Sequence, residues 1–156
     1  MDNLLVYSRE DHIYPMNQKL IKMIERYGEK DDFYGEASEA YILKAEEELK
    51  VTFPRSYREF VRRYGSGGLC GFEFEGVQGD VGASVVEATK RWRRLGLPMD
   101  AIVLEDSAEF VRCMYGAEKN DNRVFSWERK GPDLQVRYPT FEDYVIDMFQ
   151  EGIDNW

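Results

Sequence analysis

Carboxylates are the residues of this sequence best suited to do chemistry. Glu73 and Glu75 alternate with aromatic residues, which would place both on one face of a strand. Glu105, Asp106 and Glu109 gather where a strand is predicted to turn. Two carboxylates work as acid and base only when a cleft gives them different environments, and exposed carboxylates on strands are usually solvated. We therefore interpret them as a surface that binds a partner, and the candidate residues are Glu73, Glu75, Asp80, Glu105, Asp106 and Glu109.

Other residue types give no pattern for catalysis or metal binding. The single histidine, His12, has no partner for a zinc site. Cys70 and Cys113 are far apart in sequence and are interpreted as small buried residues in a reducing compartment. Ser84 is not part of a G-x-S-x-G sequence. The glycines of residues 65–71 run from helix to strand, opposite to a phosphate-binding loop. We expect no catalytic residue, no cofactor and no metal.

Composition favours a soluble binding protein with a basic partner. The chain has 156 residues and is expected to form one domain, 1–156, with residues 1–16 loosely ordered. Its formal net charge of −9 disfavours nucleic acid as a ligand and suits a basic protein such as a nuclease domain. No signal peptide and no apolar run of about 20 residues is visible, so a cytoplasmic location is expected and no membrane contact.

Helices are the first group of elements that we expect to position these acids. Capping residues and apolar spacing predict helices over residues 17–28, 38–49, 55–64, 84–96 and 140–152. In the second helix Glu46, Glu47 and Glu48 are expected to face water. Ser84 and Glu87 have the spacing of a capping box. The polar residues 29–36 between the first two helices are expected to form a mobile loop.

Short alternating segments predict a sheet. The candidates are Phe72–Glu75, Ala101–Glu105, Phe110–Tyr115, Val124–Trp127 and Leu134–Tyr138, and the links between the last four are short enough for hairpins. The fold class is therefore α+β, with a mostly antiparallel sheet of about five strands flanked by helices.

One stretch carries a family resemblance. The sequence from Ala45 to Phe60, followed by Tyr64 to Gly68, resembles the SUKH superfamily, which joins fungal cell-wall regulators of the Smi/Knr kind to bacterial immunity proteins. Residues 82–86 and 102–106 are also similar to the YobK group of immunity proteins. The motif residues pack or turn the chain and are expected to be structural: Pro54, Tyr57, Phe60, Tyr64, Gly65, Gly67 and Gly68.

The resemblance implies a curved sheet and an immunity role. Such a protein binds a toxin domain, often a nuclease delivered by a neighbouring bacterial cell, and blocks it sterically without catalysis. A regulatory or scaffold module like the fungal relatives is the alternative, and an enzyme of unknown type is disfavoured. We expect a monomer or weak dimer with a cognate toxin as its partner.

Overall fold

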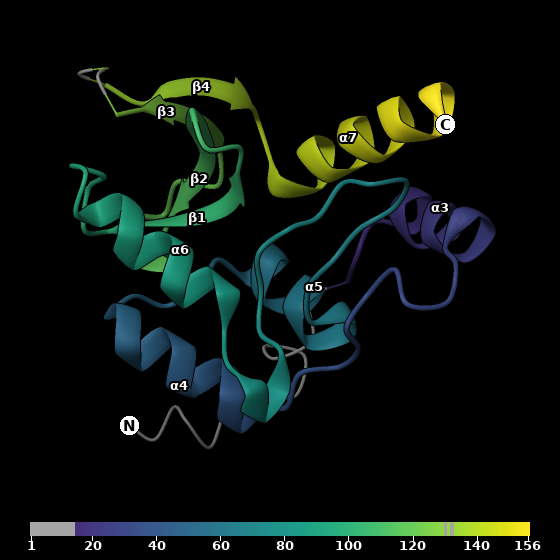
Figure 1. The fold of residues 1–156 in the computed structure, drawn as a ribbon, viewed down its shortest axis with the longest axis horizontal. Coiled ribbons are helices and arrows are strands. Elements are labelled where there is room, and N and C mark those ends of the chain that lie inside the picture. Colours follow the sequence, from purple (N-terminus) through teal and green to yellow (C-terminus); the bar gives the residue numbers. More distant parts are fainter. Residues whose placement is uncertain (1–14, 130, 132) are drawn as a thin grey trace.

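A computed structural model describes residues 15–129, 131 and 133–156 (Figure 1). His12 and most of the predicted N-terminal tail lie outside these residues, whereas Met16 is buried. The helices are α3 (Gln18–Tyr27), α4 (Glu39–Leu49), α5 (Arg55–Tyr64), α6 (Ser84–Arg93) and α7 (Phe141–Asn155), with short 3-10 turns η1 (Gly79–Val81) and η2 (Ala117–Lys119). The strands are β1 (Ala101–Asp106), β2 (Phe110–Tyr115), β3 (Val124–Glu128) and β4 (Gln135–Tyr138).

Three predicted helix starts are confirmed by their caps. The side chain of Asn17 accepts the backbone N–H of Lys19 at 2.8 Å, and Ser38 Oγ accepts that of Tyr41 at 3.3 Å. Thr140 Oγ1 accepts the third such bond, at 3.1 Å, at the start of α7. Each cap satisfies an amide that the helix itself leaves unpaired.

Two predictions about helix ends are wrong. Ser84 is the first residue of α6 and makes no cap, because its hydroxyl accepts the backbone N–H of Gly76 at 3.0 Å. Helix α7 continues past Gly152 to Asn155. Gly152 is buried, and a Cβ there would lie 3.0 Å from Cys70 Cβ, so this glycine allows close packing instead of ending the helix.

The sheet has four strands, all antiparallel, in the order β1-β2-β3-β4. The predicted fifth strand, Phe72–Glu75, does not form. Phe74 makes an isolated bridge with Gly67, and the N–H of Glu75 donates to the carbonyl of Leu104 at 2.8 Å. This segment therefore covers the β1 edge of the sheet without joining it as a strand.

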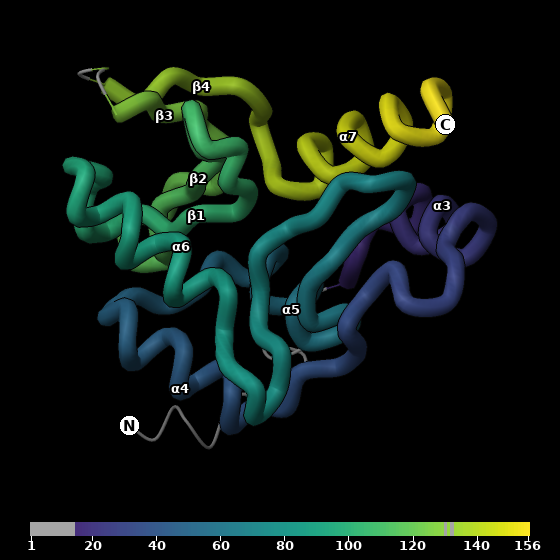
Figure 2. Tube along the Cα trace, viewed as in Figure 1, coloured from purple at the N-terminus to yellow at the C-terminus, as the bar shows by residue number. Residues whose placement is uncertain are grey.

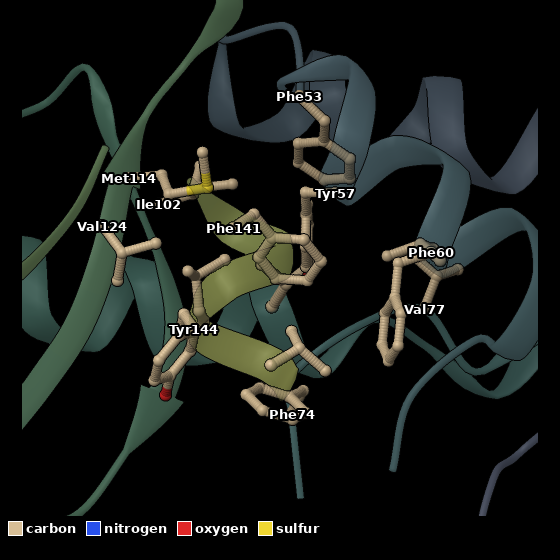
Figure 3. Close-up of a cluster of buried hydrophobic side chains, with 14 of the residues drawn as sticks. Phe53, Tyr57, Phe60, Phe74, Val77, Ile102, Met114, Val124, Phe141 and Tyr144 are labelled. Atoms are coloured by element: carbon tan, nitrogen blue, oxygen red, sulfur yellow. The ribbon is translucent and has the colours of Figure 1, made fainter. Parts of the chain in front are cut away.

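Both faces of the sheet are packed. On one face α6 lays Ala88 and Trp92 against Val103, Cys113 and Trp127. The other face shares a larger core with α3, α4, α5 and α7. Figure 3 shows aromatic rings at the centre of that core: Phe53, Tyr57, Phe60, Phe74, Phe141 and Tyr144, all at most 2% exposed. Tyr57 and Phe60, two residues of the motif, are thus core residues.

The chain between α5 and α6 makes a long excursion. Figure 2 shows it running out from α5 to the side of α7 and returning to the start of α6. Its outer end contacts α7, because Gly152 lies close to Cys70 and Phe72. This excursion carries Glu73, Glu75 and Asp80, three of the predicted partner-binding acids.

Candidate partner-binding groove

Residues 29–36 and the beginning of the excursion are far apart in sequence, but backbone hydrogen bonds join them. Gly67 bridges to Phe33 on one side and to Phe74 on the other. The N–H of Tyr34 donates to the carbonyl of Ser66 at 3.0 Å. Phe33 also packs its ring against the core aromatics, 4.8 Å from the ring of Tyr64 between centroids. Residues 29–36, predicted as a mobile loop, are therefore docked onto the excursion.

Glycine is required where these backbones cross. Gly67 has φ of +112°, and a Cβ on it would lie 2.1 Å from the carbonyl oxygen of Asp32. Gly65 has φ of +76°, and a Cβ there would lie 2.3 Å from the carbonyl oxygen of Gly35. The glycine run thus serves close backbone approach.

An acidic groove of about 350 Å³ opens between the two docked segments. Four carboxylates line it, and none of the described lining residues is a lysine or an arginine. The structure brings Glu73 and Glu75 together here and adds Asp31 and Asp32 from the docked loop. We call this the acidic groove, and its lining residues are Asp31, Asp32, Tyr34, Ser66, Gly67, Glu73, Phe74, Glu75, Gln78 and Ser84.

Glu75 is held firmly in place within the acidic groove. Its backbone is fixed on both sides, since its N–H donates to Leu104 and its carbonyl accepts the hydroxyl of Tyr57 at 2.5 Å. Burial raises the pKa of the Glu75 carboxyl, and the negative charges of Asp106 and Glu73 raise it further. Hydrogen bonding to Ser84 and the charge of Arg91 act in the opposite direction. A nearby cation would relieve this unfavourable field.

The predicted acids of the β1–β2 turn lie outside the acidic groove. Asp106 accepts a hydrogen bond from Arg91 at 2.6 Å and one from the N–H of Ala108. Burial alone would raise the pKa of Asp106, but these bonds outweigh it and hold the pKa below its ordinary value. Glu105 accepts the hydroxyl of Tyr144, and Glu109 is exposed. Two of these three acids are therefore already paired within the molecule.

Asp80 lies in a separate hollow. That space, about 370 Å³, is bounded by α4 and by the residues around η1, and Glu48 and Glu87 line it together with Lys44. The six predicted partner-binding residues thus occupy three places: the acidic groove, the β1–β2 turn and the hollow beside α4.

Asp31, Asp32 and Tyr34 were missed as site residues. Tyr34 is 53% exposed at the rim of the acidic groove. The available signal was the pair Phe33-Tyr34 within a polar segment, since two aromatic residues there indicate a segment that packs on the domain. Asp31 and Asp32 directly precede this pair, so they would lie on the surface of the excursion as well.

The described residues contain little else that is typical of a reactive site. No group of three or more His, Cys, Asp or Glu side chains among them is placed to hold a metal ion. Burial raises the pKa of the Cys113 thiol to about 12, which keeps it protonated. Within the described part of the chain, no helix is long and apolar enough to cross a membrane.

The chain also matches a known family. The model of the family described as SUKH_5, SMI1-KNR4 cell-wall, matches residues 17–150. The match includes every helix and strand named above except the last turns of α7, and it therefore covers both walls of the acidic groove.

Proposed function

The chain belongs to the SUKH family described as SMI1-KNR4 cell-wall, and from this we propose that it is an immunity protein. It binds a cognate bacterial toxin domain and blocks it sterically, acting in the cytoplasm as a monomer or weak dimer and without catalysis. The toxin domain is basic, most simply a nuclease. The observation that carries the proposal is the acidic groove, in which four carboxylates face a space that no lysine or arginine of the described residues lines.

Electrostatics supports a basic partner. A protein with a net charge of −9 attracts a basic domain over long range, and a cleft lined by one sign of charge focuses that field. Tyr34 at the rim offers an aromatic contact of the type that holds a complex together once formed. The walls of the acidic groove are fixed by backbone bonds, so little ordering entropy is lost when a partner binds.

The test is a comparison of captured partners between matched variants. The double variant Asp31→Lys, Glu73→Lys reverses two exposed charges of the acidic groove. The control, Glu128→Lys, reverses an exposed acid on β3. Each protein is used to capture partners from the native lysate, and the recovered proteins are identified by mass spectrometry. The captured toxin domain is then purified for kinetics and for assay of its own activity.

We expect the wild type and Glu128→Lys to recover a basic toxin domain at equal stoichiometry and to inhibit it. The groove variant should bind it at least about tenfold more weakly, mainly through slower association. Equal binding by both variants would show that the acidic groove is not the interface. Recovery of regulatory or envelope-synthesis proteins in place of a toxin would favour a scaffold module like the fungal relatives.

A further inference from the structure

A second hollow adjoins the acidic groove. It has a volume of about 270 Å³ and lies between the end of α3, the outer end of the excursion and the end of α7. The two spaces share one residue, Asp32, which lines both. We call it the aromatic hollow, and its lining residues are Tyr27, Glu29, Asp32, Cys70, Gly71, Ile153 and Trp156.

Two exposed aromatic rings form its rim. Trp156 is 84% exposed and Tyr27 is 41% exposed. A Cβ on Gly71 would lie 3.8 Å from the Trp156 ring, which places that ring beside the bare backbone of the excursion. The guanidinium of Arg26 lies over the Tyr27 ring at 5.3 Å and occupies part of its surface. Tryptophan and tyrosine are among the residues enriched at the positions that dominate binding energy in protein interfaces.

Among the described residues, the charged side chains that line the aromatic hollow are acidic, and the Arg26 guanidinium lies beside its rim on the Tyr27 ring. These acids are Glu29 and Asp32, and the Asp32 carboxylate is held by the N–H of Glu29 at 2.7 Å. Burial raises the pKa of the Cys70 thiol, and the charges of Asp32 and Glu29 raise it further. The thiol is therefore protonated and contributes a small apolar surface instead of a nucleophile.

The volume of the aromatic hollow suits a single side chain. Small-molecule sites usually measure roughly 300–1,000 Å³, and the aromatic hollow is smaller than that range. A single large apolar side chain is of suitable size. Asp32 also lines the acidic groove. A protein partner that is bound in the acidic groove and extends toward α7 therefore reaches the aromatic hollow along the same surface.

We infer that the aromatic hollow binds an apolar side chain of the same protein partner, adjacent to a lysine or arginine that reaches Asp32. This inference rests on the proposed function and adds a chemical pattern to it. The partner then carries an apolar anchor directly beside its basic residues. Trp156 and Tyr27 enclose the anchor, and Asp32 pairs with the neighbouring cation.

The test needs no toxin. The full chain, labelled with ¹⁵N, is titrated with a short capped peptide of alternating leucine and arginine. Two further peptides serve as controls: alternating glycine and arginine removes the apolar side chain, and alternating leucine and glutamate reverses the charge. The signals followed are the Gly71 amide and the Trp156 indole N–H. The titration is repeated with Trp156→Ala and with Met99→Ala, which removes another exposed apolar side chain.

We expect the leucine–arginine peptide to shift both signals saturably and the two control peptides to bind at least about tenfold more weakly. Trp156→Ala should weaken binding at the Gly71 amide by a similar factor, and Met99→Ala should not. Equal binding of the glycine–arginine peptide, or no saturable shift at Gly71 and Trp156, would overturn the inference. The proposed function fails by a different result, namely unchanged capture after charge reversal in the acidic groove.

Discussion

Glu59 holds two arginines on the surface of α5 while being almost completely buried itself. Its carboxylate accepts hydrogen bonds from Arg62 at 2.5 Å and 2.9 Å and from Arg63 at 2.8 Å, and it is 2% exposed. Burial alone would raise the pKa of Glu59, but the bonds from the two guanidinium groups outweigh it and lower the pKa. The ionised form is therefore the one that stabilises the fold.

This pairing predicts a pH-dependent loss of stability. Because the folded pKa lies below the unfolded value of about 4.3, the stabilisation is present above that pH and disappears as the pH falls through the folded pKa. We expect Glu59→Gln to lower the free energy of unfolding at neutral pH by about 2 kcal/mol. The difference from wild type should shrink as the solution becomes more acidic than the unfolded pKa.

Urea unfolding over a series of pH values measures this effect. Glu25→Gln, on the exposed face of α3, is the control and should change the free energy of unfolding little at any pH. A Glu59→Gln difference that stayed constant down to acid pH would mean that the lost stability comes from packing and not from the charge.

Single residues were predictable from the sequence when their environment was local. Glu46 was expected to face water as part of an acidic run, and that was wrong. It is 8% exposed, because its carboxylate accepts the N–H of Phe53 at 2.8 Å and the side chain of Arg58 at 3.1 Å. Glu73 and Glu75 were found through strand-like alternation, whereas Asp31 and Asp32 reach the acidic groove by docking of a distant loop. The spacing of residues along the sequence does not show which distant parts of the same chain a side chain will contact.

At the scale of elements, the crossing of residues 29–36 over the excursion depends on Gly67. We expect Gly67→Ala to lower the free energy of unfolding by about 2 kcal/mol or more. The added Cβ would collide with the Asp32 carbonyl, and φ is unfavourable for alanine. Gly35→Ala is the matched control, because its φ of +124° is also unfavourable while nothing lies within 4 Å of its Cβ.

Thermal or urea unfolding of the two variants separates the collision from the backbone strain. Gly35→Ala carries only the strain, about 1–2 kcal/mol. If both variants lost equal stability, close approach of the two backbones at Gly67 would not be a constraint on the fold.

The packing of α7 on the excursion gives another prediction. Gly152→Leu should destabilise the protein by about 2 kcal/mol or more, because a side chain there would enter the space of Cys70 and Phe72. Glu151→Leu adds the same side chain at the adjacent exposed position and should cost little. Circular dichroism during thermal unfolding measures both, and equal melting temperatures would contradict the packing seen at Gly152.

Elements were predicted well where capping and alternation decide them. Asn17, Ser38 and Thr140 begin their helices as expected, and the last four predicted strands form the sheet. The segment Phe72–Glu75 has strand-like alternation but forms no ladder, since its neighbours offer one bridge and one further hydrogen bond. Alternation reports which side chains are buried, and it does not report whether a partner strand is present.

For the molecule as a whole, the charge distribution predicts how binding responds to salt. The net charge of −9 and the acidic groove act over distances comparable to the Debye length, about 10 Å at 0.1 M salt. We expect the association rate with a basic toxin domain to fall at least about tenfold between low and high ionic strength, while the dissociation rate changes little. Stopped-flow or surface-plasmon kinetics measures both rates, and a salt-independent association rate would contradict electrostatic steering.

The acidic groove is built from main-chain bonds, and this has a consequence for how specificity arises. Its two walls are held together by backbone groups of Gly67, Tyr34 and Ser66. In contrast, the side chains of Asp31, Tyr34 and Glu73 project from exposed positions. Substitutions at Tyr34 and Glu73 alter the surface offered to a partner while leaving the supporting bonds in place. Asp31 has φ of +75°, a conformation that most other residues adopt only with strain. The same frame is therefore open to redesign toward a different partner by changing the two wall residues Tyr34 and Glu73.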